Sequence, residues 1–249
     1  MTRTERIVAV LCLVLAGIFA WQALLELAHS LSTPVATLGW EPDGDRRTYL
    51  TAASRWLSGG GFYLDRQLHG PYEIAFDDIL YPPPTLLLFV PFTVLPGVLW
   101  YAIPLGVIVG AVAYHRPRPF AWPIIAAAIW WPPVLVHAVS GNPVIWAAAG
   151  LALGTIWPGA SVLALVKLSL FPFGLFGIRH RTWWIALAAL AGVSALFLAM
   201  WPDYLRVVVD SRNPAGFLYS WQEVPLMFVP LAAWGLRTRR RGGRRVALP

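Results

Sequence analysis

Charged side chains are scarce in this sequence. Asp, Glu, Lys and Arg account for only 12% of its 249 residues, against about a quarter in an ordinary soluble domain. Hydrophobic residues make up 58% of the chain, and 14 residues are tryptophans. This composition excludes an ordinary soluble globular domain and predicts an all-α polytopic membrane protein.

Cysteine is nearly absent, since Cys12 is the only one. It lies inside the first apolar stretch, residues 7–28, so an intrachain disulfide and a cysteine-ligated metal cluster are both excluded. That stretch follows Arg3 and Arg6, as the h-region of a signal sequence would. It is longer than the roughly 7 to 15 residues of a cleavable h-region. We therefore expect an uncleaved first transmembrane helix.

The net charge of +7 comes largely from a few short clusters, which hold twelve of the nineteen Lys and Arg residues. The clusters are Arg3 with Arg6, Arg116 with Arg118, Arg179 with Arg181, and the basic tail at 237–249. Neither basic–aromatic interleaving nor a folded polar domain accompanies them, which argues against a nucleic-acid partner. The bias that keeps positive loops cytoplasmic explains them better, and it predicts that both termini are cytoplasmic.

A span needs about 20 apolar residues to cross the hydrocarbon core. The apolar stretches are 7–28, 82–114, 120–138, 142–157, 159–178, 183–201 and 223–236. Stretch 82–114 is too short for two crossings and contains prolines, so we expect one broken crossing there. Stretch 159–178 must return to the side on which it starts if every basic cluster is to be cytoplasmic. We interpret it as a re-entrant hairpin with Lys167 near its turn, and backbone of that kind must be surrounded by protein or border a water-filled cavity.

The resulting organisation is a single transmembrane domain, residues 1–236, with about six crossings and one hairpin. Outer loops are expected at 29–81 and 202–223, and a basic cytoplasmic tail at 237–249. Ten of the twelve acidic residues fall in these two loops: Glu41, Asp43, Asp45, Asp65, Glu73, Asp77, Asp78, Asp203, Asp210 and Glu223. The polar chemistry of the protein is therefore predicted on its outer face.

An amphipathic helix is predicted at 46–57 in the first outer loop. Its apolar arc includes Tyr49 and Trp56, which would serve as aromatic anchors at the membrane interface. Asp45 stands where a carboxylate caps a helix, but a rigidly held carboxylate there would also serve as a general base. Arg46 and Arg47 fit contact with lipid headgroups, and equally a bidentate contact with the phosphate of a lipid-linked substrate.

Several segments occur in an order that resembles a known family. They are "DRRTYLTAASRWLSGG" from Asp45, "YPPPTLLLFVPFTVLP" from Tyr81, "SGNPVIW" from Ser140, and "ALVKLSLFPFGLFGIRHRTWW" around Lys167. Together they resemble the polyprenol-phosphate-mannose-dependent mannosyltransferases of the glycosyltransferase-C superfamily, particularly the bacterial α-mannosyltransferases that extend phosphatidylinositol mannosides and lipomannan. Such enzymes are longer than this chain, and their Gly-Gln turn reads Gly141-Asn142 here.

The resemblance implies a multi-pass enzyme of the bacterial plasma membrane. It would move a hexose, mannose above all, from a polyprenyl-phosphate donor to a glycan or glycolipid acceptor on the outer face, by inverting single displacement. Asp45 maps onto the base, with Asp43 as the fallback. Lys167, Arg46, Arg47 and His137 are the candidates for the donor phosphate, and Tyr49, Tyr81 and Asn142 are the candidates for other substrate contacts. The resemblance requires no metal and no cofactor, because the lipid-linked sugar is itself a substrate.

Structural alternatives accompany these assignments. Lys167 near a hairpin turn fits a side chain that snorkels to the interface, and His137 fits a hydrogen-bonding residue at a helix end. Asp77 and Asp78 are adjacent acids without further ligands, which is weak support for a metal site. For the whole chain, the alternatives are a transporter or lipid translocase lined by Lys167 and the hairpin, and a shortened inactive relative that binds a lipid-linked sugar. The short second half also leaves room for a partner protein.

Overall fold

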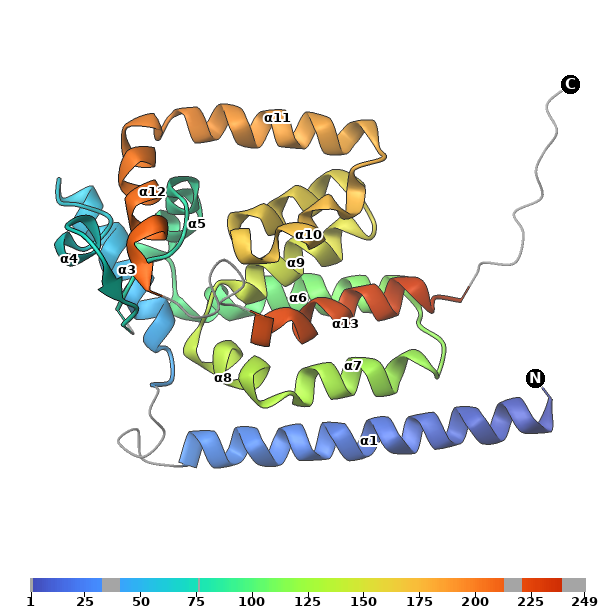
Figure 1. Cartoon of the computed structure of the whole chain (residues 1–249). Helices are drawn as coiled ribbons and strands as arrows, with labels where there is room; N and C mark the ends of the chain where they lie inside the picture. The colour runs from blue at the N-terminus through green and yellow to red at the C-terminus, as the bar shows by residue number, and fades with distance from the viewer. Residues whose placement is uncertain (1, 33–40, 76, 213–220, 239–249) are drawn as a thin grey trace, which may run out of the picture.

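The protein is α-helical, as its composition predicts. The computed structural model describes residues 2–32, 41–75, 77–212 and 221–238 (Figure 1). Its longer helices are α1 (Arg3–Ser32), α3 (Gly44–Leu57), α6 (Gly97–His115), α7 (Ala121–Trp130), α8 (Pro132–Ser140), α9 (Val144–Gly154), α11 (Arg181–Ala195), α12 (Trp201–Asp210) and α13 (Val224–Gly235). All but Arg237 and Thr238 of the predicted basic tail lies outside the described residues.

Two helices, α1 and α6, are each long and apolar enough to cross a membrane. Two bent pairs raise that number to four if each pair is one span: α7 with α8, bent by 62°, and α11 with the segment Leu198–Asp210, bent by 76°. Helices α9 and α13 have 11 and 12 residues, which is fewer than the roughly 20 needed to span. The total of six crossings therefore stays a prediction.

Three of the predicted stretches differ in detail from the helices observed. The crossing expected at 82–114 is α6 alone, with Pro104 inside it, while Pro83–Thr93 forms a separate short segment. The stretch 120–138 is not continuous, because α7 gives way to α8 at Trp131, directly before two prolines that lack backbone N–H donors. The stretch 183–201 likewise ends at Ala195, and the chain then turns sharply into α12.

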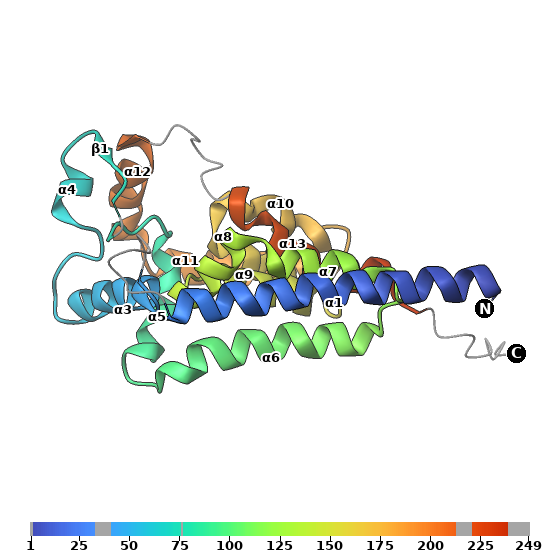
Figure 2. The ribbon, with the colours of Figure 1, turned by 90° about the horizontal axis from the view of Figure 1, so that it is seen from below.

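Four helix ends that adjoin basic clusters lie at one end of the molecule (Figures 1 and 2): the start of α1, the end of α6, the start of α11 and the end of α13. Arg118 N donates to Leu236 O at 2.9 Å, and Pro117 pairs with Arg237 in an isolated bridge. The predicted parity of the crossings, and the side of a membrane that this end faces, stay predictions.

The two predicted outer loops meet at the opposite end, where α3, α4 (Asp65–Leu68) and α12 lie together (Figure 1). Strand β1 (Tyr72–Glu73) pairs in parallel with β2 (Ser211–Arg212). Tyr72 Oη donates to Val207 O at 2.8 Å across the same contact. The two loops thus form one polar layer at this end of the molecule.

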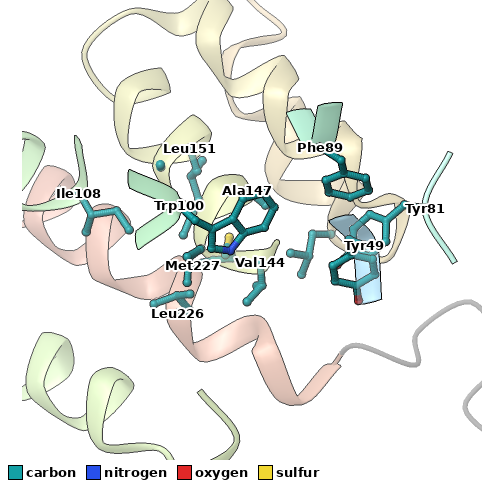
Figure 3. Packing of buried hydrophobic residues seen from close by; sticks show 14 of the residues in the cluster. Tyr49, Tyr81, Phe89, Trp100, Ile108, Val144, Ala147, Leu151, Leu226 and Met227 are labelled. Carbon is teal, nitrogen blue, oxygen red and sulfur yellow. The ribbon is translucent and has the colours of Figure 1, made fainter. Parts of the chain in front are cut away.

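Helix α9 occupies the centre of the helical layer, and nine of its eleven residues are buried. Around it pack Trp100 of α6 and Met227 of α13, both fully buried (Figure 3). Tyr49, Tyr81 and Phe89 continue the cluster toward the polar layer (Figure 3). The core therefore runs directly from the apolar helices to the base of α3.

The predicted hairpin at 159–178 is present as a chain reversal built from short helical turns: η3 (Pro158–Val166), η4 (Leu168–Leu170), α10 (Phe171–Gly174) and η5 (Leu175–Gly177). Its two arms are so close that a Cβ on Gly177 would lie 2.2 Å from Pro158 O. Helix α9 supports the first arm through Gly150 and Gly154, which face Leu163 and Ser161. This spacing of small residues allows two backbones to approach closely in a membrane protein.

We expect Gly154→Leu to loosen the hairpin. A Cβ at Gly154 would meet the Cβ and backbone N of Ser161 at 2.7 and 2.8 Å, so the arm must move. Overpacking of this kind costs about 1 to 3 kcal/mol. Thermal unfolding in detergent should show a clear drop in Tm for Gly154→Leu. Gly110→Leu is the control, since nothing lies within 4 Å of a Cβ there, and an equal drop in both variants would contradict the packing.

Candidate functional site

Helix α3 begins at Gly44, so Asp45 lies in its first turn and is not the N-cap residue. The cap position is held by Asp43, whose φ of 62° turns the chain into the helix earlier than predicted. The assignment of Asp45 as a helix cap is therefore wrong. The Asp45 carboxylate points instead to the α8–α9 turn, where its Oδ2 accepts hydrogen bonds from Ser140 Oγ at 2.9 Å and Asn142 Nδ2 at 2.8 Å.

Asp43, Arg46 and Arg47 form ion pairs around the start of α3. Arg46 forms an ion pair with Asp43, and Tyr101 Oη donates to Asp43 Oδ1 at 2.7 Å. Burial raises the pKa of Asp43, but the hydrogen bonds from Arg46 and Tyr101 outweigh it and hold the pKa below its usual value. Arg47 is exposed and pairs with Glu41. The fallback base and both arginines thus have protein partners at the edge of the polar layer.

A polar cavity of about 330 Å³ opens between α3, the 74–81 segment, α8, the hairpin and the start of α13. This volume lies at the lower end of the range for small-molecule pockets. Six of the predicted site residues line it: Asp45, Tyr49, Tyr81, His137, Asn142 and Lys167. Asp43, Arg46 and Arg47 do not line it. The structure therefore brings together six of the nine residues that the sequence singled out.

Asn142 joins the charged groups of this cavity. Its Nδ2 donates to Asp45, while its Oδ1 accepts from Tyr81 Oη at 3.2 Å, Lys167 Nζ at 3.2 Å and Val144 N at 3.0 Å. These partners fix which way the amide points, because three donors face the oxygen and a carboxylate faces the nitrogen. One side chain thereby sets the separation between the acidic and the basic group.

Gly141 places Asn142 at this position. Its φ of 78° is readily adopted only by glycine. A Cβ there would lie 2.7 Å from Tyr101 Oη and 2.8 Å from Arg46 Cβ. Trp100 Nε1 also donates to Gly141 O at 2.9 Å, which ties the turn to the core.

Lys167 is buried and paired, which excludes a side chain that snorkels to the interface. Its Nζ donates to Glu223 Oε1 at 2.6 Å, and both side chains are at most 4% exposed. His137 Nε2 lies 3.7 Å from the same carboxylate oxygen. Glu223 was counted among the outer acids but was not selected as a site residue. The available signal was that a lysine buried in a membrane protein needs a counter-ion, and Glu223 begins the last apolar stretch.

Tyr49 is a core residue and not an interfacial anchor. Its ring stacks on Phe89 with centroids 5.2 Å apart and meets the edge of Tyr81 at 5.1 Å. The amphipathic pattern of α3 was predicted correctly, but the apolar face packs against protein, chiefly the segments Leu86–Phe89 and Val90–Thr93. The platform of the first outer loop is thus fixed to the helical core.

Asp77 and Asp78 are held by Arg66, which forms ion pairs with both. Burial raises the pKa of Asp78, and hydrogen bonds from Ala75 N and Arg66 only partly offset this effect. No group of three or more His, Cys, Asp or Glu side chains in the described part of the chain is placed to hold a metal ion. Asp78 lines the cavity as one half of an ion pair with Arg66.

A larger apolar groove of about 700 Å³ lies between η3, α11 and residues 84–88. A small junction of about 120 Å³ adjoins both spaces. It shares Tyr81 and Lys167 with the polar cavity, and it shares Leu88, Leu163 and Val166 with the groove. The junction therefore lies between the polar cavity, with its charged groups, and the apolar groove beside α11.

We expect Asn142→Ala to destabilise the fold more than Ser140→Ala. The first change removes the acceptor of three donors and the donor to Asp45, whereas the second removes one hydrogen bond to that carboxylate. A buried polar group left unpaired costs about 1 to 3 kcal/mol. Unfolding in detergent should show a loss of several kcal/mol for Asn142→Ala and about 1 kcal/mol for Ser140→Ala. Equal losses would remove Asn142 from the centre of the network.

Comparison of the chain with protein-family models, with curated proteins and with solved structures finds no match. The feature that distinguishes the site is a carboxylate and a lysine bridged by one amide, near the apolar groove.

Proposed function

We propose that the chain is an integral-membrane glycosyltransferase that moves a hexose, mannose in the first instance, from a polyprenyl-phosphate donor to a glycan or glycolipid acceptor. The proposal includes a glycosyltransferase-C-like fold with six crossings and the hairpin, the cavity opening on the outer face of a bacterial plasma membrane. The observation that supports it is the order of three neighbouring spaces: the polar cavity with Asp45 and Lys167, the small junction that shares Lys167 with it, and the apolar groove that shares Leu163 with the junction. Such an order suits a molecule with a polar head and a long apolar tail.

Asp45 is the base in this proposal. Ser140 and Asn142 hold one of its oxygens, Oδ2, while Oδ1 accepts no hydrogen bond from the described residues. Helix α3 fixes the carboxylate beside the cavity on a rigid element. A general base must lie within hydrogen-bond reach of the proton that it takes, and an acceptor hydroxyl in the cavity meets that condition at Oδ1.

The reaction is a single displacement at the anomeric carbon. The acceptor oxygen forms a bond to this carbon as its proton passes to Asp45, and the bond from the carbon to the phosphate oxygen breaks. The electron pair of that bond leaves with the polyprenyl phosphate, so negative charge grows on the phosphate in the transition state. Lys167 is the cation in the cavity wall placed to stabilise that charge.

The apolar groove accounts for the lipid part of the donor. Leu163 and Val166 of η3 and Ile185 and Val193 of α11 line it, with Leu88 at its inner end. An isoprenoid chain gains about 0.8 kcal/mol for each methylene group that it removes from water, but bilayer lipid offers the same gain. The groove therefore directs the tail and holds the head in register with Asp45, while the phosphate supplies the selectivity.

Transfer of radiolabelled mannose from polyprenyl phosphate mannose to a panel of glycolipid acceptors tests the proposal. Membranes that carry the protein should transfer label, and Asp45→Asn should lower the rate by about 10²- to 10⁴-fold, the usual effect of losing a general base. Asp203→Asn is the matched control, because Asp203 is partly exposed on α12 and pairs with Arg206 away from the cavity.

The possible outcomes separate the alternatives. Full activity of Asp45→Asn together with inactive Asp43→Asn would move the base to the fallback residue. No transfer by the wild-type protein to any acceptor, in the presence of bound donor, would favour a lipid-binding relative without activity. Movement of the unreacted lipid across a sealed vesicle membrane would favour a translocase.

A further inference from the structure

The lysine that would meet the donor phosphate already has a carboxylate partner. Lys167 and Glu223 form an ion pair with N–O distances of 2.6 and 2.5 Å and are buried from solvent. A buried ion pair is costly to break one side at a time, because the remaining charge then lacks compensation. Any anion that binds Lys167 must therefore replace Glu223 or share the lysine with it.

The charges around the cavity make sharing unfavourable. Asp45 and Glu223 are two acids that flank one lysine, and Asp78 is already paired with Arg66. A phosphate that entered while Glu223 stayed on Lys167 would meet like charge on both sides. Like charges brought together in an interface cost several kcal/mol.

The surrounding geometry permits replacement. Lys167 lines both the polar cavity and the junction, whereas Glu223 lines the polar cavity and not the junction. A phosphate whose tail enters by the junction thus approaches Lys167 from a side that Glu223 does not occupy. On the other side of Glu223, His137 Nε2 is 3.7 Å from Oε1. Hydrogen bonds of this kind reach about 3.2 Å, so a small movement of the carboxylate would bring it within hydrogen-bond distance of His137.

We propose that Glu223 is a displaceable counter-ion that occupies Lys167 until the phosphate of a polyprenyl lipid takes its place, whereupon the carboxylate moves to His137. The inference extends the proposed function, since it takes from it the lipid phosphate as ligand. Glu223 is a positioning residue here and touches no reacting atom. Displacement of Glu223 makes the site selective for polyprenyl phosphate over neutral polyprenol. A phosphate gives Lys167 a negative charge in exchange for the carboxylate, whereas a neutral polyprenol of the same length gives it none.

Equilibrium binding of undecaprenyl phosphate and of undecaprenol to the full-length protein in phosphatidylcholine nanodiscs tests this inference without any transfer reaction. Glu223→Gln removes the competing charge, so the dissociation constant for undecaprenyl phosphate should fall by about tenfold or more. Binding of undecaprenol should not change. The double variant Glu223→Gln with Lys167→Met should lose the gain, and Glu73→Gln is the matched control, since Glu73 is exposed and lies outside the cavity.

Unchanged or weaker binding of undecaprenyl phosphate to a folded Glu223→Gln protein would overturn the inference. An equal gain for undecaprenol would also overturn it, because the effect would then be one of space and not of charge. If Glu223→Gln does not fold, Glu223→Asp decides the matter. The shorter aspartate side chain weakens the ion pair with Lys167 but keeps the charge. A smaller gain in affinity for undecaprenyl phosphate would therefore support the displacement of this carboxylate by the phosphate, and no gain would contradict it.

This test and the transfer assay fail separately. Tighter binding of undecaprenyl phosphate by Glu223→Gln, without mannose transfer by the wild-type protein, would support the counter-ion role of Glu223 and contradict the glycosyltransferase activity. Mannose transfer by the wild-type protein, with no effect of Glu223→Gln on phosphate binding, would support the activity and contradict the counter-ion role.

Discussion

The site depends on the orientation of one amide, that of Asn142. Its nitrogen donates to Asp45, and its oxygen accepts from Lys167 and Tyr81. A reversed amide would put an oxygen against a carboxylate and N–H groups against an ammonium, so the two charges specify one state. Because Asp45 comes from α3 and Lys167 from the hairpin, this side chain also joins the polar layer to the apolar layer.

The turn before Asn142 and the helix after it fix the position of that amide. Gly141 gives the turn its left-handed conformation, and Trp100 binds the carbonyl oxygen of that glycine from within the core. Helix α9, which starts directly after the turn, carries the small residues on which the hairpin rests. The position of Lys167 relative to Asp45 is thus set by backbone packing on one side of Asn142 and by the start of α3 on the other.

The polar cavity and the apolar groove both share wall residues with the small junction between them. Tyr81 and Lys167 stand at the boundary, with Lys167 Nζ 5.4 Å from the ring centroid of Tyr81. A ring face beside an ammonium tolerates both an anion on the lysine and an apolar chain against the ring edge. The junction is therefore suited to the point at which a phosphate meets its lipid.

Much of this arrangement was readable from the sequence. The apolar stretches predicted an all-helical chain, and together with the basic clusters they predicted the chain reversal around Lys167. The segment order predicted that Asp45, Lys167 and His137 belong together, and they line one cavity. These features depend on composition and parity, which are local properties of the chain.

The remainder depends on long-range contacts that no local pattern reports. Asp43 stands at the start of α3 in place of Asp45, and its backbone is bound to the last turn of α8, where Asp43 N donates to Val139 O at 2.9 Å. Tyr49 reads as an interfacial anchor on a helical wheel, yet Phe89 and Tyr81 cover it. Glu223 lies 56 residues from its partner Lys167, so the sequence signals the need for a counter-ion, and the folded chain shows which acid supplies it.

In the proposed function, one lipid phosphate occupies the cavity with its tail in the groove beside α11. An experimental structure of the full chain in lipid nanodiscs with bound polyprenyl phosphate tests this placement. We expect phosphate density at about 3 Å from Lys167 Nζ and a chain that passes Leu88 and Leu163 into the groove. Phosphate density elsewhere, or a tail that leaves the cavity without entering the groove, would contradict it.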